Sequence, residues 1–388
     1  MDKRYIIVAG ACLTQFMVIG LLFSYGLFFK VFEEEFGWSR LTLSAAMALS
    51  FFMMGVLAMV AGRLNDRFGP RIVLSVSGLI FGLGVTLFSQ ITEPWQLFAL
   101  FGVFIAIGMS THDVVTLSTV ARWFDKKRGL MTAVTKVGTA VGQFSVPPLA
   151  AWLILGWGWR EAIVILGIGS ALVLVVGGLM TKAPTRVAAQ SGERPADGVS
   201  FKEARRTRTF WTICALQALF FPCLMTVPLH IVVHGTDLGL ELDEAATFLM
   251  VMSAASVIGR LSVGTMTDRI SGKMAYLMCF VPLALSIASF KVIEDVRLLY
   301  VALAFYGFAH GGFFTVVSPT VAGYFGLRAH GAIFGVVLFF GTIGGSIGPI
   351  LAGHIFDVTD SYQLAFTILS AMAVLGLFLS LTLPRRNL

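Results

Sequence analysis

Charged residues are scarce in this chain. Asp, Glu, Lys and Arg make up 13% of its 388 residues, whereas 57% of the residues are apolar. Soluble domains carry about 25% charged residues, and a protein of this length has too little interior to hide so much apolar surface from water. The composition therefore excludes a soluble globular enzyme and a disordered chain. It favours a polytopic membrane protein, and the 41 Gly agree with that class because Gly is common in membrane helices.

The chain is also poor in residues that build disulfide, metal or catalytic sites. Its cysteines all lie in apolar runs without C-x-x-C spacing: Cys12, Cys214, Cys223 and Cys279. His230 and His234 are spaced for one helix face but have no third ligand nearby, so neither a disulfide framework nor a metal site is predicted. Without a Walker A loop or a catalytic triad, we expect no cofactor, no ATP-driven pump and no enzyme.

Long apolar runs dominate the rest of the sequence. A membrane helix needs about 20 mostly apolar residues, and twelve such runs can be marked. They cover residues 5–29, 41–62, 72–91, 95–121, 130–155, 161–180, 209–234, 245–265, 274–291, 297–322, 331–354 and 363–383. The first run is longer than a signal-peptide core of about 7–15 residues, so it is predicted to stay in the protein. The fold class predicted is an all-α membrane protein with 12 transmembrane helices.

Basic residues are distributed unevenly between the two sets of loops. With twelve spans both termini lie on one side, and 21 of the 28 Lys and Arg fall on that side against 5 on the other. Cytoplasmic loops carry the excess of basic residues, so both termini are predicted to lie in the cytoplasm, in a bacterial inner membrane. This asymmetry explains the net charge of +7 without nucleic acid, and no nucleic-acid partner is expected.

The chain also divides into two similar halves. Residues 182–208 form the only long polar stretch, which predicts a cytoplasmic linker between six-helix bundles at 1–181 and 209–388. Several residues recur at a constant separation of 202 positions: Gly62 and Gly264, Asp66 and Asp268, Gly129 and Gly331, Gly142 and Gly344, and Pro147 and Pro349. Six spans are an even number, so the copies have the same orientation. Such a parallel repeat places a substrate site at the interface of the halves.

One loop carries a specific motif. Residues 62–71, GRLNDRFGPR, resemble the loop signature G-x-L-x-D-R-x-G-x-R of the major facilitator superfamily, and residues 264–269, GTMTDR, resemble a degenerate second copy. The resemblance implies the major facilitator fold and a gating role for the loop charges, which pair at a helix end and separate when the halves rock. These charges belong to Asp66, Arg67, Arg71, Asp268 and Arg269. The alternative is that they only anchor the loops among lipid headgroups.

Three further segments resemble the monocarboxylate porter and oxalate/formate antiporter branch of that superfamily. They are EFGWSR at 35–40, RWF at 122–124 with RGL at 128–130, and GWR at 158–160. The resemblance implies a secondary active transporter of small organic anions, foremost monocarboxylates, that works by alternating access with proton symport or anion exchange. Its expected partners are the substrate, protons or a counter-anion, and the bilayer, and a monomer is expected. The alternatives are an exporter of a drug or metabolite and a membrane sensor that moves nothing.

Charges inside the bilayer are costly, so the few that are present are functional candidates. Only Asp113, Lys136 and Arg260 lie well inside spans. Counted along a helix, they are roughly 14, 10 and 12 Å deep. The guanidinium of Arg260 matches a carboxylate, and its position resembles that of the family's substrate-binding arginine. The alternative is a structural arginine paired with Asp113.

Other residues of these spans complete the predicted site. His310 could hydrogen-bond the substrate or carry a proton, although a packing histidine is the alternative. An apolar wall for a short organic chain is predicted from Leu22, Phe23, Tyr306, Phe314 and Phe334.

Val337 bears on the substrate class. In the oxalate-exchanging members the matching position looks to be a lysine. Here a second carboxylate of the substrate would face valine, and it would lose its hydration without gaining an ionic or hydrogen-bonding partner. This predicts discrimination against oxalate, unless Lys136 reaches the substrate. Asp113 is the foremost candidate for proton coupling because Arg260 cannot lose its proton, and His310 and Lys136 are the others. The alternative for Asp113 is a permanent pair with Lys136 or Arg260 that only neutralises buried charge.

Overall fold

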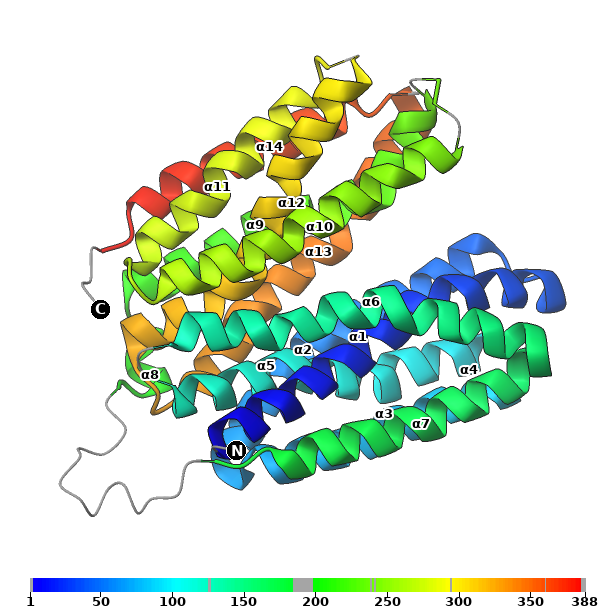
Figure 1. Cartoon of the computed structure of the whole chain (residues 1–388), viewed down its shortest axis with the longest axis horizontal. Coiled ribbons are helices and arrows are strands. Elements are labelled where there is room, and N and C mark those ends of the chain that lie inside the picture. The colour runs from blue at the N-terminus through cyan, green and yellow to red at the C-terminus, as the bar shows by residue number, and fades with distance from the viewer. Residues whose placement is uncertain are drawn as a thin grey trace. The chain divides into compact units, whose positions relative to one another are not determined.

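Every apolar run forms a helix in the computed structural model of the chain (Figure 1). The structure describes residues 3–124, 127–183, 198–237, 239–240, 242–293, 295–359 and 361–384. Within these ranges, twelve helices are long and apolar enough to cross a membrane. The predicted all-α fold with 12 spans is therefore confirmed, and the protein is an integral, multi-pass membrane protein.

The chain forms two compact units, and each takes in the start of one helix whose remainder belongs to the other. Unit 1 comprises Met1–Asp125, Val134–Gly198 and Leu327–Phe339. Its helices are α1 (Lys3–Phe36), α2 (Arg40–Phe68), α3 (Pro70–Leu87), the short helix η1 (Phe88–Gln90), α4 (Pro94–Ala99), the π-helix η2 (Leu100–Ile105), α5 (Ala106–Trp123), most of α6 (Arg128–Trp157) and α7 (Trp159–Met180).

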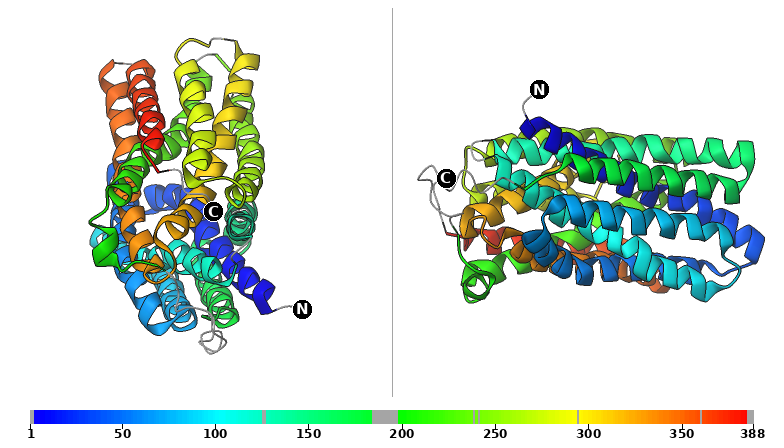
Figure 2. Two further views of the ribbon diagram at one scale, coloured as in Figure 1. Left: turned by 90° about the vertical axis from the view of Figure 1, so that its left-hand side faces the viewer. Right: turned by 90° about the horizontal axis from the view of Figure 1, so that it is seen from below.

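Unit 2 comprises Lys126–Ala133, Val199–Gly326 and Phe340–Leu388. Its helices are α8 (Phe201–Ala204), α9 (Arg208–Asp237), α10 (Leu242–Thr267), α11 (Gly272–Ser289), α12 (Val296–Phe325), most of α13 (His330–Thr359) and α14 (Gln363–Leu381). The two further views show the long helices of each unit running side by side (Figure 2).

The packing partners repeat between the two sets of helices. The second span packs on the fourth (α2 on α5) and the third on the sixth (α3 on α7). In the same way the eighth packs on the tenth (α10 on α12) and the ninth on the twelfth (α11 on α14). This agrees with the parallel repeat inferred from the constant sequence separation. The domain boundary at 182–208 stays a prediction, because residues 184–197 lie outside the described ranges.

Helix ends are set by local chemistry rather than by the limits of the apolar runs. Ser39 and Ser271 cap α2 and α11 by accepting hydrogen bonds from backbone N–H groups three residues on. Between α2 and α3 the chain turns at Gly69, whose φ of 81° suits only glycine without strain, and Pro70 then begins the next helix. Most helices extend past the predicted runs, since polar residues at a membrane surface continue the same backbone hydrogen bonds.

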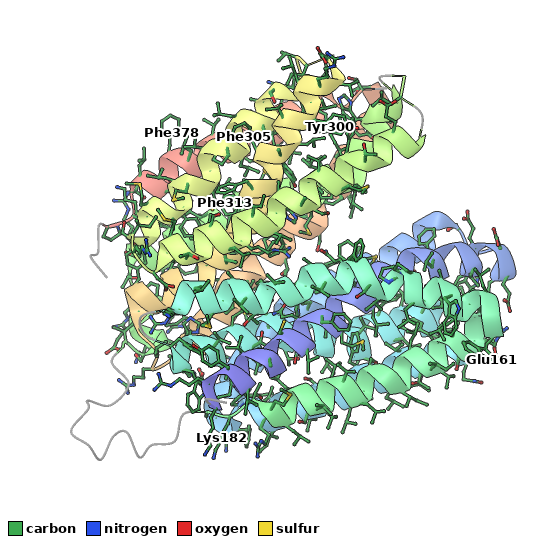
Figure 3. All side chains as sticks on the ribbon, viewed as in Figure 1. Glu161, Lys182, Tyr300, Phe305, Phe313 and Phe378 are labelled. Atoms are coloured by element: carbon green, nitrogen blue, oxygen red, sulfur yellow. The ribbon has the colours of Figure 1, made fainter. Side chains whose placement is uncertain are left out.

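Large apolar side chains cover much of the outside of each unit. On unit 2, Phe305 of α12 and Phe378 of α14 are 55% and 61% exposed, whereas Phe313 of α12 is 1% exposed in the interior (Figure 3). Exposure of such rings to water would be unfavourable, while contact with lipid tails is not. The outward-facing aromatic residues are therefore the surface expected of helices that lie in lipid.

Candidate functional site

A buried ion pair lies within unit 1. Asp113 of α5 and Lys136 of α6 form a salt bridge, and their side chains are 15% and 2% exposed. The ring of His112, next to Asp113 on α5, places its Nε2 atom 3.5 Å from the same carboxylate. A buried ion pair is stable only where the remaining hydrogen-bonding groups of both residues are satisfied, so the surrounding side chains have to supply these bonds.

Gln15 of α1 supplies much of that surrounding. Its side chain is fully buried. Its Nε2 carries two hydrogens for three acceptors within hydrogen-bonding distance: Oδ1 of Asp113 at 2.8 Å, the carbonyl oxygen of His112 at 2.9 Å and the hydroxyl of Thr116 at 3.0 Å. The amide oxygen accepts from Thr139 at 3.0 Å and lies 3.5 Å from the ammonium of Lys136. Gln15 thus contacts both members of the ion pair and joins α1 to α5 and α6.

A second polar cluster lies in unit 2, between α10 and α12. Arg260 is 2% exposed, and its guanidinium carbon lies 5.6 Å from the centre of the Phe314 ring. One turn earlier on each helix, Ser256 Oγ lies 3.1 Å from Nδ1 of His310. The rings of His310 and Phe314 are 5.0 Å apart and nearly perpendicular. The four side chains therefore form a compact group with one cation, one imidazole and one aromatic face.

Two glycines allow the helices of this cluster to approach. A Cβ at Gly311 would lie 1.9 Å from the carbonyl oxygen of Ser256, and a Cβ at Gly259 would lie 2.0 Å from that of Phe308. Any larger residue at either position would push α10 and α12 apart. Close contact through small residues is a common means of packing membrane helices, and here it holds His310 within reach of Ser256.

Tyr306 of α12 has a bonding role of its own in unit 2. Its hydroxyl donates to the carbonyl oxygens of Cys223 and Leu224 on α9, at 2.9 and 3.2 Å. Pro228 has no N–H to give to the carbonyl of Leu224, four residues earlier, so the proline leaves that oxygen without its helical donor. Tyr306 supplies the missing bond and is fully buried there.

The motif aspartates lie at the starts of two other helices. In unit 2, Asp268 accepts from the backbone N–H of Gly129 at 2.6 Å and of Leu130 at 3.0 Å, at the first turn of α6. In unit 1, Asp66 accepts from the N–H of Ala332 at 3.3 Å, near the start of α13, and also forms a salt bridge with Arg122. A carboxylate at a helix N-terminus satisfies free N–H donors and complements the helix dipole.

The glycines of the sequence repeat make these contacts possible. A Cβ at Gly62 would lie 2.1 Å from the carbonyl oxygen of Gly331, and a Cβ at Gly129 would lie 2.0 Å from that of Gly264. The end of α2 therefore touches the start of α13 in the same way that the end of α10 touches the start of α6. Three of the pairs repeated at a separation of 202 positions thus form two equivalent joints: Gly62 and Gly264, Asp66 and Asp268, and Gly129 and Gly331.

The remaining motif arginines have different surroundings. Arg71 donates to the carbonyl oxygen of Leu179 at the end of α7, at 2.9 Å. Arg67 lies over the ring of its neighbour Phe68, 5.1 Å from its centre. Arg269 is exposed. The structure therefore gives the aspartates, rather than these arginines, the contacts at the two joints.

The comparisons with known proteins identify the family. The sequence profile of the family described as Major Facilitator Superfamily matches the chain over residues 11–293 and 235–387. The chain belongs to the major facilitator superfamily. This membership makes it a transporter rather than an enzyme, and it confirms the resemblance drawn from the loop motif.

Curated relatives and solved structures of the superfamily extend over nearly the whole chain. Monocarboxylate transporter 13 of Rattus norvegicus is 26% identical over 399 residues, which cover 98% of this chain and 89% of the relative. The uncharacterized MFS-type transporter YhjX of Escherichia coli is 25% identical, with 89% and 86% covered. The structure of the proton:xylose symporter XylE matches with a TM-score of 0.75 at 13% identity, covering 100% and 97%. The last likeness concerns the fold alone.

Within this superfamily fold, the predicted wall residues belong to both units. Phe314 joins the Arg260 cluster, and Leu22 is 7% exposed at an apolar cavity of about 50 Å³ inside unit 1. Phe23 is 55% exposed, whereas Phe334 and Val337 are buried in unit 1 at 2% and 0%. The predicted wall and the role given to Val337 stay predictions.

Two residues with central positions in these clusters were missed from the sequence. Gln15 and Ser256 are uncharged and stand in apolar runs, where a single polar residue is ordinary. A signal existed only for Ser256, which lies one helical turn before Arg260 and so shares its face of the helix. Nothing comparable pointed to Gln15, whose partners are about a hundred residues away along the chain.

Removing the carboxylate of Asp268 should loosen the joint between α10 and α6. We expect Asp268→Ala to cost about 1 kcal/mol, as the loss of a helix cap does, and to lower the midpoint of thermal unfolding in detergent by about 1–2 °C. Burial raises the pKa of Asp268, against the effect of its two N–H donors and of Arg128. Asp268 should therefore take up its proton at a higher pH than an exposed aspartate does. A carboxyl pKa that is raised on folding favours the folded state as the pH falls, so acidification should not lower the unfolding midpoint through this residue.

The neighbouring Arg269→Ala is the matched control, since it removes an exposed charge from the same loop. It should leave the unfolding midpoint unchanged. Equal losses in the two variants would contradict a capping role and favour a general effect of loop charge.

Proposed function

We propose that this protein is a secondary active transporter of small monocarboxylates that works by alternating access. A relative named as a monocarboxylate transporter, Monocarboxylate transporter 13 of Rattus norvegicus, aligns over 98% of the chain. The observation that carries the proposal is the burial of Arg260, 2% exposed on a membrane-spanning helix beside His310 and Phe314. An arginine at such depth is costly unless it serves a function.

In this proposal each member of the unit 2 cluster has a part in binding. The guanidinium of Arg260 binds the carboxylate of the substrate through two parallel hydrogen bonds. The ring of Phe314 packs against the organic chain, and the imidazole of His310, fixed by Ser256, offers its other nitrogen to a polar group of the substrate. No bond of the substrate is broken, so the site needs only to bind and release.

The driving force is proton symport or anion exchange. Asp113 carries the proton in the symport mechanism, because it is the deep carboxylate and because its partner Lys136 gains freedom when the carboxylate is neutralised. The joints at Asp66 and Asp268 lie on the cytoplasmic side, following the excess of basic residues in those loops. In this proposal the two helix caps break and re-form as the transporter changes conformation.

The substrate class is one carboxylate rather than two. The ammonium of Lys136 is already paired with Asp113, and the side chain is 2% exposed. In this proposal it does not bind a second carboxylate group of the substrate. A dicarboxylate such as oxalate would bury one charge without a partner. This is the same preference that Val337 suggests from the sequence.

A thermal-shift panel of mono- and dicarboxylates with one to six carbons tests the proposal. Purified protein should be stabilised by monocarboxylates of three or more carbons, by about 2.7 kcal/mol at a concentration of 100 times the Kd, and oxalate should have no effect. The same panel on Arg260→Ala should show no shift with any acid. Stabilisation of the unmodified protein by oxalate alone, or of Arg260→Ala by monocarboxylates, would refute the assignment.

A further inference from the structure

The most extensively bonded polar side chain of the unit 1 cluster has no part in the function proposed so far. Gln15 is fully buried, and its amide touches five groups on α5 and α6. A buried amide of this kind is expected to satisfy its donors and acceptors. Here it does so on both members of one ion pair, so the amide is in a position to influence the protonation of the carboxylate.

We propose that Gln15 is a positioning residue that sets the pH at which Asp113 takes up a proton. The inference rests on the proposed coupling role of Asp113 and names the residue that regulates it. The geometry points to this role because the two ends of the amide face groups of opposite charge. Nε2 lies 2.8 Å from the carboxylate of Asp113, and the amide oxygen lies 3.5 Å from the ammonium of Lys136.

The orientation of the amide follows from what each partner can offer. An ionised carboxylate only accepts hydrogen bonds and an ammonium only donates them. A flipped amide would direct its oxygen at the carboxylate and at the carbonyl oxygen of His112, and its N–H groups at the ammonium. Asp113, the carbonyl oxygen of His112 and Lys136 therefore fix the orientation in which the amide donors face Asp113, whereas the hydroxyl of Thr139 could either donate or accept.

Donors held against a carboxylate favour its ionised form. When Asp113 takes up a proton, the bond from Gln15 loses its charge assistance while the amide still donates to the carbonyl oxygen of His112. The other groups that face Asp113 are Lys136 from α6 and His112 from its own helix. Gln15 from α1 has no ionisable group, so its replacement by another uncharged residue changes no charge.

Gln15→Met tests the inference, because methionine has a similar length and no hydrogen-bonding amide. Infrared titration of the protein in liposomes without substrate follows the carboxyl band that is absent from Asp113→Asn. We expect the midpoint of that band to move up by about one pH unit in Gln15→Met, a tenfold rise in proton affinity for the loss of a charged hydrogen bond. Thr139→Val is the matched control. It removes a bond to the other end of the amide and should leave the midpoint nearly unchanged.

The outcomes separate this inference from the proposed function. An unchanged or lowered midpoint in Gln15→Met overturns it, and so does the absence of any Asp113 band from the titration of the unmodified protein. If Gln15→Met does not fold, Gln15→Glu serves instead. It replaces the donor by a second carboxylate and should raise the midpoint further, so an unchanged midpoint there also overturns the inference. A raised midpoint without a matching shift in the pH profile of uptake retains the role of Gln15 and removes Asp113 from coupling.

Discussion

Arg260→Ala is expected to abolish uptake of monocarboxylates into proteoliposomes. The substitution removes the cation that the substrate carboxylate would meet at membrane depth, where water cannot replace it. Loss of one partner of a buried, hydrogen-bonded charge pair costs about 2–5 kcal/mol, which corresponds to a decrease of at least about 30-fold in apparent affinity. Initial uptake of a labelled acid at several concentrations measures the loss as a rise in KM, beyond the accessible range if the upper figure applies.

Arg260→Lys should be almost as severe. Lysine keeps the charge but not the planar fork that binds two carboxylate oxygens, and it is less suited to the face of the Phe314 ring. Arg297→Ala is the matched control, because Arg297 is an exposed arginine at the start of α12 and belongs to neither polar cluster. Undiminished transport of monocarboxylates by Arg260→Ala would contradict the proposed function. It would favour the exporter of a drug or metabolite, whose substrates need not all depend on one arginine.

Asp113→Asn is expected to lose accumulation driven by a pH gradient while it retains exchange of labelled for unlabelled substrate. Asparagine preserves the shape of the side chain and can still accept the hydrogen bond from Gln15, but it cannot carry a proton across the membrane. Exchange needs only that the loaded transporter changes its conformation, whereas accumulation needs a coupled ion. Comparing counterflow with uptake under an imposed pH gradient separates the two activities in one preparation.

The ion pair complicates this variant, because Asp113→Asn leaves Lys136 buried without its carboxylate. Breaking a buried pair from one side costs about 3–5 kcal/mol. The double variant Asp113→Asn with Lys136→Met removes both charges and should recover most of that stability, and it should still lack proton-driven accumulation. Full accumulation in the double variant would exclude Asp113 from the mechanism and transfer the role to His310. Loss of exchange together with accumulation in the double variant would show instead that the pair is only structural.

The sequence by itself determined the class, the number of spans and the symmetry of this protein. Backbone groups in lipid have to be satisfied within each helix, so every long apolar run had one available structure. The separation of 202 positions between Asp66 and Asp268 then established the repeat, because insertions had not disturbed it between the halves. Arg260, Asp113 and Lys136 could be singled out for the same reason, since a charge inside an apolar run stands out.

Only the tertiary structure decided which of these residues meet. The sequence left Asp113 a choice between Lys136 and Arg260, and the structure pairs it with Lys136 inside unit 1. It also showed that Gln15 bonds to residues 97 to 124 positions away, and that Asp268 caps α6 from 139 positions away. Such contacts depend on the rotation and depth of whole helices against one another. An apolar run specifies that a helix forms, but the neighbouring helices decide which of its few polar side chains find a partner.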